Sequence, residues 1–206
     1  ASGSWYLYGT TFDGSVGKIN SYSAYNSNVG TFSTTSQGQL PQKLGWVDAV
    51  TASVGGTQYV YVVGGESSGG ANQSTVYKAT IDSSGNIGTF ATTNQAQLLV
   101  IRSRESVTTA TVSGTSYIYV TGGYGYNSTV YKAQIDGSGN VGAFSTTSQG
   151  QLLVNSGMHR TVNTTIGGTQ YLYVTGGYNS VDAEISVVYK ATIDGSGNAG
   201  TFATTS

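Results

Sequence analysis

The chain has 206 residues, enough for one sizeable hydrophobic core, and only 8% of them are charged, with a formal net charge of -1. This balance gives no electrostatic reason to expect nucleic acid or an anionic membrane surface as a partner. Cysteine is absent, which excludes disulfides and a thiol nucleophile, and no apolar stretch approaches the roughly 18 residues of a membrane span. The 31 glycines and single proline indicate short strands joined by tight turns.

Four copies of one pattern follow one another along the chain. In each copy a strand of aromatic and aliphatic residues begins at a tyrosine, and a Gly-X-Phe triplet comes later. The tyrosines are Tyr6, Tyr59, Tyr117 and Tyr171, which are 53, 58 and 54 residues apart. A period of this length indicates repeated supersecondary units that stack on one another, because one unit alone cannot bury its apolar face.

Each copy is expected to form four short antiparallel strands. In the third copy these are 106–112, 117–121, 129–135 and 142–147. The first is rich in β-branched residues, the second is apolar on both faces, and the third alternates between apolar and polar residues. The segment 136–140, Asp-Gly-Ser-Gly-Asn, is expected to be a turn stabilised by its Asp side chain. A calcium loop is disfavoured there, because the later Glu of an EF-hand is missing.

The glycine pairs at 64-65, 122-123 and 176-177, and the strand before each pair, resemble the kelch repeat of β-propellers. The third strands open with a matching tyrosine, whereas phenylalanine stands where the family usually has tryptophan. The resemblance implies an all-β fold, a β-propeller of four-stranded antiparallel kelch-like blades. A single repeat domain, 1–206, is expected, with blades at about 1–36, 37–94, 95–148 and 149–206.

The first copy is degenerate, and its blade is expected to lack the innermost strand. A propeller normally closes by borrowing a strand from the opposite terminus, because an open blade leaves a bare edge. Three interpretations follow. The chain is a fragment of a longer repeat protein, or two copies complete one eight-bladed ring, or four blades close a small ring. Strand exchange into a fibre is a further outcome of the same unpaired edge.

Variation between the copies is concentrated in two windows. The first covers 43–48, 101–106 and 155–160, where all three arginines, the only histidine and one of the two tryptophans occur. The second follows each glycine pair. In an antiparallel four-stranded blade both windows lie on one face, while the nearly identical turns lie on the other. Diversified loops on a repeated scaffold are typical of a binding face.

The candidate ligand-binding residues come from these two windows. Aromatic rings stack on sugars, guanidinium groups pair with carboxylates, and polar side chains exchange hydrogen bonds with hydroxyl groups. The candidates are Trp46, Asp48, Arg102, Arg104, Glu105, Tyr124, Tyr126, His159, Arg160, Tyr178, Asp182 and Glu184. No catalytic residues are expected: the arginines are similar to the cluster of sialidases, but no nucleophile pair can be placed beside them. With a single histidine, neither a metal site nor a cofactor is expected.

These features predict a non-catalytic extracellular recognition or adhesion module, not an enzyme, that binds a glycan or a surface protein. The alternative is a structural building block joined through its open blade edge, and the third hypothesis is a glycan-active enzyme. Self-association that completes the open blade is also expected, whereas nucleic-acid binding and membrane insertion are not. The composition favours an extracellular or cell-surface location, where the sequons at Asn72 and Asn127 are glycosylation candidates. The sequon at Asn163 is expected to be inaccessible within its strand.

Overall fold

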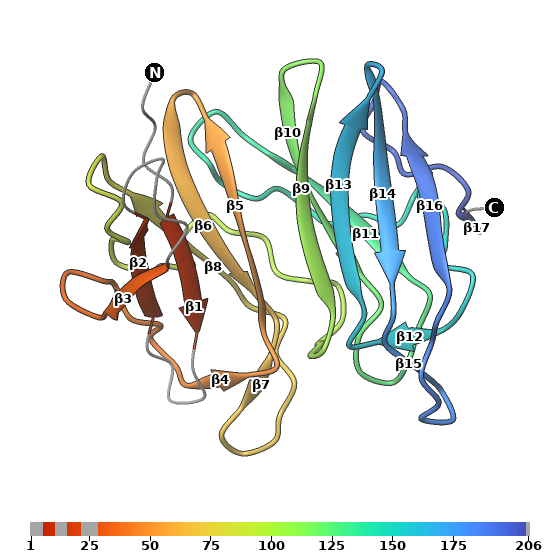
Figure 1. Ribbon diagram of the computed structural model, residues 1–206, viewed down its shortest axis with the longest axis horizontal. Helices are drawn as coiled ribbons and strands as arrows, with labels where there is room; N and C mark the ends of the chain where they lie inside the picture. Colours follow the sequence, from red (N-terminus) through yellow and green to blue (C-terminus); the bar gives the residue numbers. More distant parts are fainter. Residues whose placement is uncertain (1–5, 11–15, 22–28, 205–206) are drawn as a thin grey trace.

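The computed structural model describes residues 6–10, 16–21 and 29–204, the first three strands by their backbone alone, and all regular structure in this part is β-strand (Figure 1). The described residues form no helix long and apolar enough to cross a membrane. Four larger antiparallel sheets, numbered I to IV along the chain, contain most of the strands.

Sheet I contains β1 (Tyr6–Thr10), β2 (Val16–Ser21) and β3 (Val29–Ser33). Sheet II contains β5 (Asp48–Val54), β6 (Thr57–Val63) and β8 (Val76–Ile81). Sheet III contains β9 (Ser106–Val112), β10 (Thr115–Thr121) and β11 (Val130–Ile135). Sheet IV contains β13 (Arg160–Ile166), β14 (Thr169–Thr175), β16 (Val188–Ile193) and β17 (Ala203–Thr204). Two short ribbons pair β4 (Leu44–Gly45) with β7 (Glu66–Ser67), and β12 (Ser156–Gly157) with β15 (Tyr178–Asn179).

Tight turns explain why the first two strands of sheets II, III and IV pair in one register. Gly55 and Gly56, which join β5 to β6, have φ angles of 57° and 81°, and the turns at 113-114 and 167-168 have similar values. Two successive left-handed residues form the hairpin turn whose twist matches that of the flanking strands. Val54 consequently pairs with Thr57. The predicted first three strands are confirmed in sheet III to within two residues at each end.

The predicted fourth strand is shorter than the sequence indicates. In sheet III the segment after the turn meets β11 only at isolated bridges, Lys132 with Ser145 and Ile135 with Val141. Phe144, which lies between these bridges, is buried in the core between sheets II and III. In sheet IV the fourth strand is the two-residue β17. The expectation of four full strands is therefore corrected for sheets II, III and IV, where the last segment of the copy pairs with the sheet at only a few residues.

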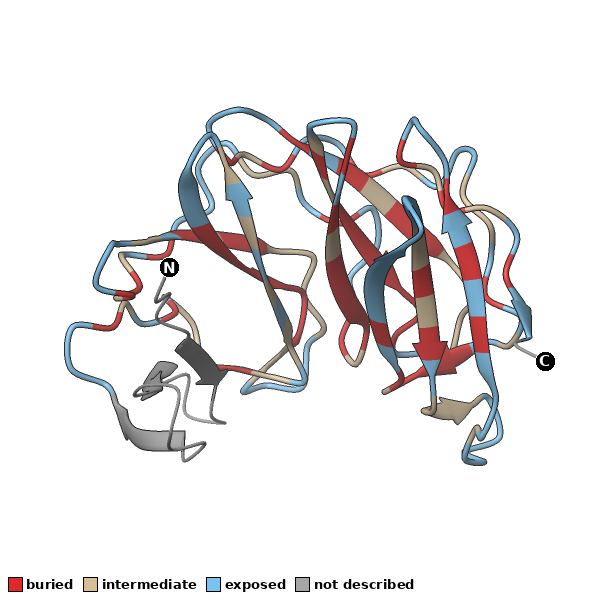
Figure 2. Ribbon diagram, turned by 45° about the horizontal axis from the view of Figure 1, so that its top comes forward, coloured by how far each residue is buried: buried red, intermediate tan, exposed pale blue. Residues whose placement is uncertain are grey.

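The core lies between neighbouring sheets, which pack face to face (Figure 2). Between sheets II and III the fully buried side chains include Tyr61, Val63, Ile118 and Val120. Between sheets III and IV they include Tyr119, Leu172, Val174 and Tyr189. The first strands β5, β9 and β13 lie side by side along one edge. This arrangement is typical of β-propellers, although in the described part no strand pairing joins sheet I to sheet IV into a closed ring.

A repeated polar contact joins each sheet to the next. The Tyr61 hydroxyl donates to the carbonyl oxygen of Gly139 at 2.8 Å, and Lys78 Nζ donates to Oδ1 of Asn140 at 2.6 Å. Between sheets III and IV the same two bonds run from Tyr119 to Gly197 at 2.7 Å and from Lys132 to Asn198 at 2.5 Å. We call this pair of bonds the latch and the segments 136–140 and 194–198 the latch turns. The latch accounts for the near identity of these turns, because each must present the same acceptors to the preceding sheet.

The latch turns are also the Asp-stabilised turns that the sequence predicts. Asp136 Oδ1 accepts the N–H groups of Ser138 and Asn140, both at 2.8 Å. The latch turn at 136–140 lies beside the hairpin turn of the preceding sheet, since a Cβ added to Gly55 would be 3.5 Å from the carbonyl oxygen of Gly137. The ribbons β4–β7 and β12–β15 lie at the opposite end of the sheets (Figure 1). The prediction that sequence variation gathers on one face is confirmed.

Candidate functional site

The ribbons β4–β7 and β12–β15, with the loops that lead into the inner strands, form what we call the variable face. Trp46, Arg104 and Met158 occupy equivalent positions in it, and their φ angles of 52°, 61° and 59° are left-handed. The N–H of Arg104 donates to the Trp46 carbonyl at 3.0 Å, and the N–H of Met158 to the Arg104 carbonyl at 2.8 Å. A left-handed non-glycine residue costs about 1–2 kcal/mol. The surrounding structure therefore holds a strained backbone at the same place in sheets II, III and IV, and the side chain at that place varies.

Trp46, Arg104 and Tyr124 form an exposed group of two rings and a cation. The Arg104 guanidinium carbon lies 4.8 Å from the centre of the Trp46 ring and 5.4 Å from that of Tyr124. Trp46 is 45% exposed and Tyr124 55% exposed. Cation–π attraction at such sites contributes about 0.5–1 kcal/mol per pair, which holds the three side chains together. Much of both rings stays open to solvent, and so to the apolar face of a sugar.

Asp48 begins β5 on the same face and connects two sheets through its carboxylate. Its Oδ2 accepts the N–H of Val107 at 2.9 Å and the hydroxyl of Ser106 at 3.3 Å. Arg160 Nη1 lies 4.0 Å from the same oxygen. The Arg160 side chain is 66% exposed, so water screens most of this attraction. Asp48 is thus a partly exposed carboxylate fixed at the inner edge of sheets II and III.

Glu105, one residue before β9, is a buried carboxyl group. It is 1% exposed, and neither carboxyl oxygen has a hydrogen-bond partner among the described residues. A Cβ added to Gly64 would overlap this carboxyl, which places it directly beside the glycine pair of sheet II. Burial raises the pKa of Glu105 to about 8, and the charge of Asp48 adds to this rise. The nearby N–H groups of Glu105 itself and of Gly65, and the Arg102 charge, oppose it without closing a hydrogen bond. Glu105 therefore holds its proton at neutral pH.

Arg102 does not stand at the surface where the sequence analysis expects a ligand contact. It is 4% exposed, and its guanidinium donates to the carbonyl oxygen of Gly122 and, at 2.7 Å, to the hydroxyl of Tyr131. The guanidinium carbon also lies 4.6 Å from the centre of the Tyr131 ring. Through these bonds Arg102 connects sheet II to sheet III. The expectation that Arg102 contacts a ligand is therefore corrected.

His159 is likewise buried, at the place in sheet IV that is equivalent to Glu105 in sheet III. It is 0% exposed, and its ring nitrogens lie 2.8 Å from the hydroxyl of Thr121 and 3.1 Å from that of Ser156. Burial, with a smaller effect of the Arg160 charge, lowers the pKa of His159 to about 4. Both nitrogens are occupied, so the expected ligand contact is corrected here too. The sequence shows no sign of this burial, because the window that contains His159 looks polar and variable.

Tyr126, Tyr178, Asp182 and Glu184 lie together at the outer part of the variable face. The Tyr126 hydroxyl donates to the Asp182 carboxylate, a hydrogen bond that raises the pKa of Tyr126. Tyr178 forms a bridge with Glu184 through the backbone, and it pairs with Gly157 in the ribbon β12–β15. These contacts connect the loops of sheets III and IV, while Trp46, Arg104 and Tyr124 connect the faces of sheets II and III.

Two pockets differ in how well they suit a ligand. One, of about 270 Å³, lies on the variable face and is lined by Lys43, Trp46, Glu66 and Ser67 among others. Glu66 pairs with Gly45 across the ribbon β4–β7, which brings the two variable windows to one pocket. Lys43 and Glu66 are not among the expected ligand contacts, although their places in the two variable windows were a signal.

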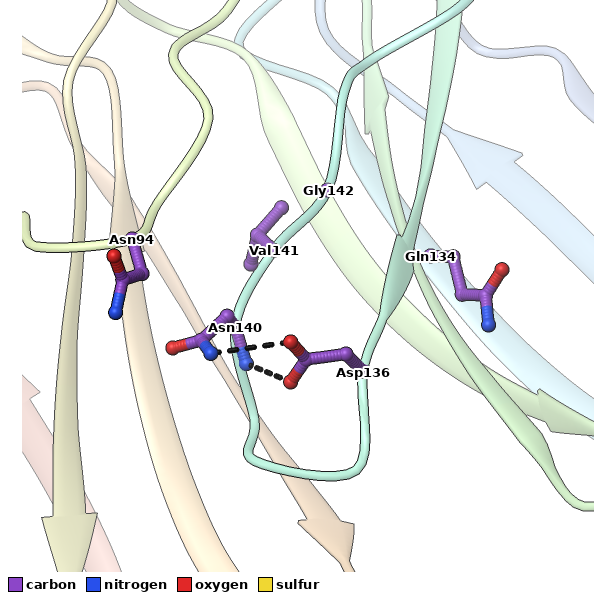
Figure 3. A pocket seen from close by; sticks show the side chains of 6 residues that line it. All are labelled: Asn94, Gln134, Asp136, Asn140, Val141 and Gly142. Atoms are coloured by element: carbon purple, nitrogen blue, oxygen red, sulfur yellow. Dashed lines mark hydrogen bonds between the residues drawn. The ribbon is translucent and has the colours of Figure 1, made fainter.

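The second pocket, of about 500 Å³, lies at the latch turn on the opposite face, where Asp136 and Asn140 are already bonded to each other (Figure 3). Its polar groups belong to the latch, so the pocket beside Trp46 is kept as the candidate site. No group of three or more histidines or carboxylates in the described residues is placed to hold a metal ion.

The glycosylation candidates are half-buried on the variable face. Asn72 accepts a hydrogen bond from the Ser103 hydroxyl at 2.7 Å, and Asn127 accepts one from the N–H of Thr129 at 3.2 Å. Asn163 is exposed, contrary to the expectation that its strand would hide it. In the first strand of sheet IV it pairs with Leu172 of the next strand, and its side-chain oxygen accepts a hydrogen bond from the Thr108 hydroxyl at 3.4 Å.

Comparison with known proteins places the fold. No protein-family model and no curated protein match the sequence. Among solved structures, an exo-1,5-α-L-arabinanase from a bovine ruminal metagenomic library matches with a TM-score of 0.51 and 13% identity, over 97% of this chain and 74% of its own. An engineered GH43 glycoside hydrolase with endo-xylanase and exo-arabinofuranosidase activity matches with a TM-score of 0.51 and 16% identity, over 97% and 38%. A chain in the cryo-EM structure of RAG with one melted and one unmelted RSS matches with a TM-score of 0.55 and 15% identity, over 100% and 65%.

The chain adopts an all-β, propeller-type fold, and it spans between 38% and 74% of the length of these three chains. At 13–16% identity the similarity shows the fold alone. Two of the three are glycoside hydrolases, so this scaffold is one on which glycan-active enzymes are built. This finding overturns the expectation of a non-catalytic recognition or adhesion module that is not an enzyme.

Proposed function

We propose that the chain is a glycan-active enzyme that hydrolyses glycosidic bonds at the variable face. The observation that supports this most directly is a pair of carboxyl groups in different surroundings at the starts of neighbouring inner strands. Asp48 is hydrogen-bonded to backbone and hydroxyl donors and partly exposed, whereas Glu105 keeps its proton to about pH 8. Glycosidases commonly use such a pair, in which one group protonates the leaving oxygen and the other acts as nucleophile or base.

In the proposed reaction Glu105 donates its proton to the glycosidic oxygen as the bond to the anomeric carbon breaks. Asp48 acts on that carbon, either directly or by taking a proton from the attacking water. The hydroxyl of the water ends on the new sugar end, and its remaining proton restores the carboxyl pair. Because Glu105 is 1% exposed, the proposal requires the segment 103–105 to move when a glycan binds.

The groups proposed to bind the glycan surround Asp48. The exposed rings of Trp46 and Tyr124 offer stacking surfaces for sugar rings, and Arg104 offers donors to hydroxyl or carboxylate oxygens. The pocket of about 270 Å³ beside Trp46 has room for a sugar ring, and Glu66 and Lys43 line it with an acceptor and a donor. The similarity in fold to glycoside hydrolases supports the proposed glycan binding, but the main support comes from the residues of the variable face.

We also propose that sheets I to IV are four kelch-like blades. The first glycine of each pair has φ near 60° and the second between 92° and 117°, so the motif has a common backbone at 64-65, 122-123 and 176-177. Glycine adopts these angles without strain, which supports a shared repeat. An extracellular or cell-surface location would suit a polymeric glycan, and it stays a prediction.

The test is an assay for glycan hydrolysis by the intact chain. Release of reducing ends from arabinan and xylan, and of chromophore from aryl arabinofuranosides and xylosides, would be measured for the wild type and for Asp48→Asn and Glu105→Gln. Loss of a general acid or base commonly costs about 10²–10⁴-fold in rate, and we expect losses in this range for both. Absence of hydrolysis across a broad glycan panel would overturn the proposal.

The matched control is Asp82→Asn, which makes the same carboxylate-to-amide change on the opposite face. An asparagine oxygen can still accept the N–H groups of Ser84 and Asn86 that Asp82 binds, and only the exposed hydrogen bond from Asn86 Nδ2 is lost, so both fold and activity should persist. If Glu105→Gln keeps full activity while Asp48→Asn loses it, Glu105 is a structural residue and the acid must be sought elsewhere.

A further inference from the structure

The outer face of sheet IV, which points away from sheet III, exposes apolar residues whose equivalents in sheets II and III are buried or partly buried. Val188 is 39% exposed, whereas its equivalents Val76 and Val130 are each 1% exposed. Ile166 is 57% exposed against 8% for Val112. Val162 is 52% exposed against 6% for its equivalent, Thr108. Side chains of this kind are covered wherever another sheet follows, so the outer face of sheet IV has the composition of an interface.

The latch donors of sheet IV are also present on this face. Tyr173 and Lys190 occupy the places of Tyr61 and Lys78 in sheet II, and Lys190 lies 5.4 Å from the Tyr171 ring as Lys78 lies 5.2 Å from the Tyr59 ring. Within the described residues no acceptor is bonded to the Tyr173 hydroxyl or to the Lys190 ammonium. The two donors of a latch, the Tyr173 hydroxyl and the Lys190 ammonium, are therefore both present on this face without an acceptor among the described residues.

The glycine pair of sheet IV repeats this pattern. A Cβ added to Gly64 would overlap Glu105, and one added to Gly122 would overlap His159. In both cases a residue of the next sheet fills the space beside the glycine, which we call the glycine seat. At Gly176 the nearest atom is the carbonyl oxygen of Ile185, 4.0 Å away in the same sheet's loop. Three independent features of sheet IV, its apolar residues, its latch donors and its glycine seat, thus match surfaces that receive another sheet.

Sheet I has the backbone register of a sheet that fits such a surface. Leu7 pairs with Ile19, and Ile19 pairs with Phe32, which puts the three residues in one row across the sheet. The sequence-equivalent residues of sheet IV are Leu172, Ala191 and Phe202, which are at most 2% exposed and pack against sheet III. Sheet I and sheet IV stand at opposite ends of the row of sheets, so sheet I of the same chain does not cover sheet IV (Figure 1).

We propose that the outer face of sheet IV binds sheet I of a second copy of this chain, head to tail. In backbone register, the row of Leu7, Ile19 and Phe32 of one copy takes the place against Val162, Ile166 and Val188 of the other that the equivalent row of sheet IV takes against sheet III, and Tyr173 and Lys190 are donors at this contact. The contact repeats between chains the geometry that joins sheets II to III and III to IV within one chain.

The first test is the native mass of the intact chain, measured by light scattering over a range of concentrations. We expect a mass of at least twice the 21.2 kDa of one chain at micromolar concentration. Val162→Asp combined with Ile166→Asp should weaken association by about 100-fold or more, since both side chains lose apolar burial and gain a charge. Leu99→Asp, at a residue 61% exposed elsewhere, is the matched control and should associate like the wild type.

A complementation test separates this contact from any other. A chain with Ile19→Asp has its sheet I row disrupted, and the Val162→Asp, Ile166→Asp chain has its sheet IV face disrupted, so each alone should be monomeric. Mixed together, they should form a one-to-one dimer through the single intact contact. Circular dichroism of each variant checks that the fold is kept. A monomeric wild type, or a mixture that stays monomeric although both variants are folded, would overturn the proposal.

Discussion

Glu105 and His159 occupy equivalent seats beside the glycine pairs of sheets II and III, and each is buried in its uncharged form. The pKa of Glu105 is raised from its ordinary 4.5 to about 8, so between these values the folded chain holds a proton that the unfolded chain releases. Stability therefore falls as pH rises from about 4.5 to 8. The pKa of His159 is lowered from 6.5 to about 4, so its contribution falls as pH drops through that range. The two effects oppose each other between pH 4.5 and 6.5.

We therefore predict a plateau of stability between about pH 4.5 and 6.5 and a decline from 6.5 to 8. Glu105→Gln should remove the decline, because a neutral amide replaces a group that becomes charged, and the gain at pH 8 should be on the order of 4 kcal/mol. Urea unfolding followed by circular dichroism at several pH values measures this. The pH dependence of Asp82→Asn should match that of the wild type. An unchanged decline in Glu105→Gln would show that another group is responsible.

The glycine pairs act at the scale of the element, because they let the next sheet approach the backbone. Gly122 and Gly176 have similar φ angles of 60° and 68°, so alanine should cost a similar backbone strain at both, about 1–2 kcal/mol. At Gly122 the added Cβ would also overlap the His159 ring and the Ser156 carbonyl, whereas at Gly176 the nearest atom is 4.0 Å away.

Gly122→Ala should therefore destabilise the chain by at least about 2 kcal/mol more than Gly176→Ala, since backbone and a packed ring have to move. Comparing urea midpoints of the two variants in the monomeric Val162→Asp, Ile166→Asp background isolates the seam between sheets III and IV. Equal losses of stability would mean that strain in φ alone explains the glycine pair, and that the seat next to it is not tightly packed.

The strands that could be predicted from the sequence are those with local causes. The β-branched run from Ser106 to Val112 and the tight turn after it specify a hairpin. The structure has its first strand with the predicted bounds and begins its second strand at Thr115, two residues before the predicted start. The fourth strand could not be predicted in the same way. Its length depends on where Phe144 enters the core between two sheets, and that contact is formed by residues far apart in the sequence.

For the candidate site, the sequence predicted that the two variable windows share one face, but not which of their side chains are buried. Trp46, Asp48 and Arg104 lie where the variable windows indicate, and they share one surface. Arg102 and His159 lie in the same windows but are 4% and 0% exposed. A window of six residues that crosses from a loop into the seam between two sheets contains both kinds of position. Residue type does not distinguish the exposed positions from the buried ones, because the contacts between neighbouring sheets include polar side chains as well as apolar ones.

At the scale of the whole molecule, the sheets differ in how many neighbours cover them. Sheet III is packed on both faces, and Ile118, Tyr119 and Val120 in β10 are all 0% exposed. Sheet IV is packed on one face only, so β14 alternates between buried residues such as Leu172 and partly exposed ones such as Tyr171. Covered sheets open only when the whole molecule unfolds, whereas a sheet with one neighbour can separate at lower cost.

Backbone amides of β10 should therefore exchange with solvent deuterium more slowly than those of β14, although both strands are central in their sheets and have nearly the same sequence. Mass-spectrometric hydrogen exchange on peptides covering 115–121 and 169–175 measures the difference, and the monomeric Val162→Asp, Ile166→Asp chain is the reference state. In the wild type at high concentration the difference should shrink, because a second copy then covers sheet IV. Equal protection of the two strands in the monomeric chain would mean that the row of sheets unfolds as one unit, with no weaker end.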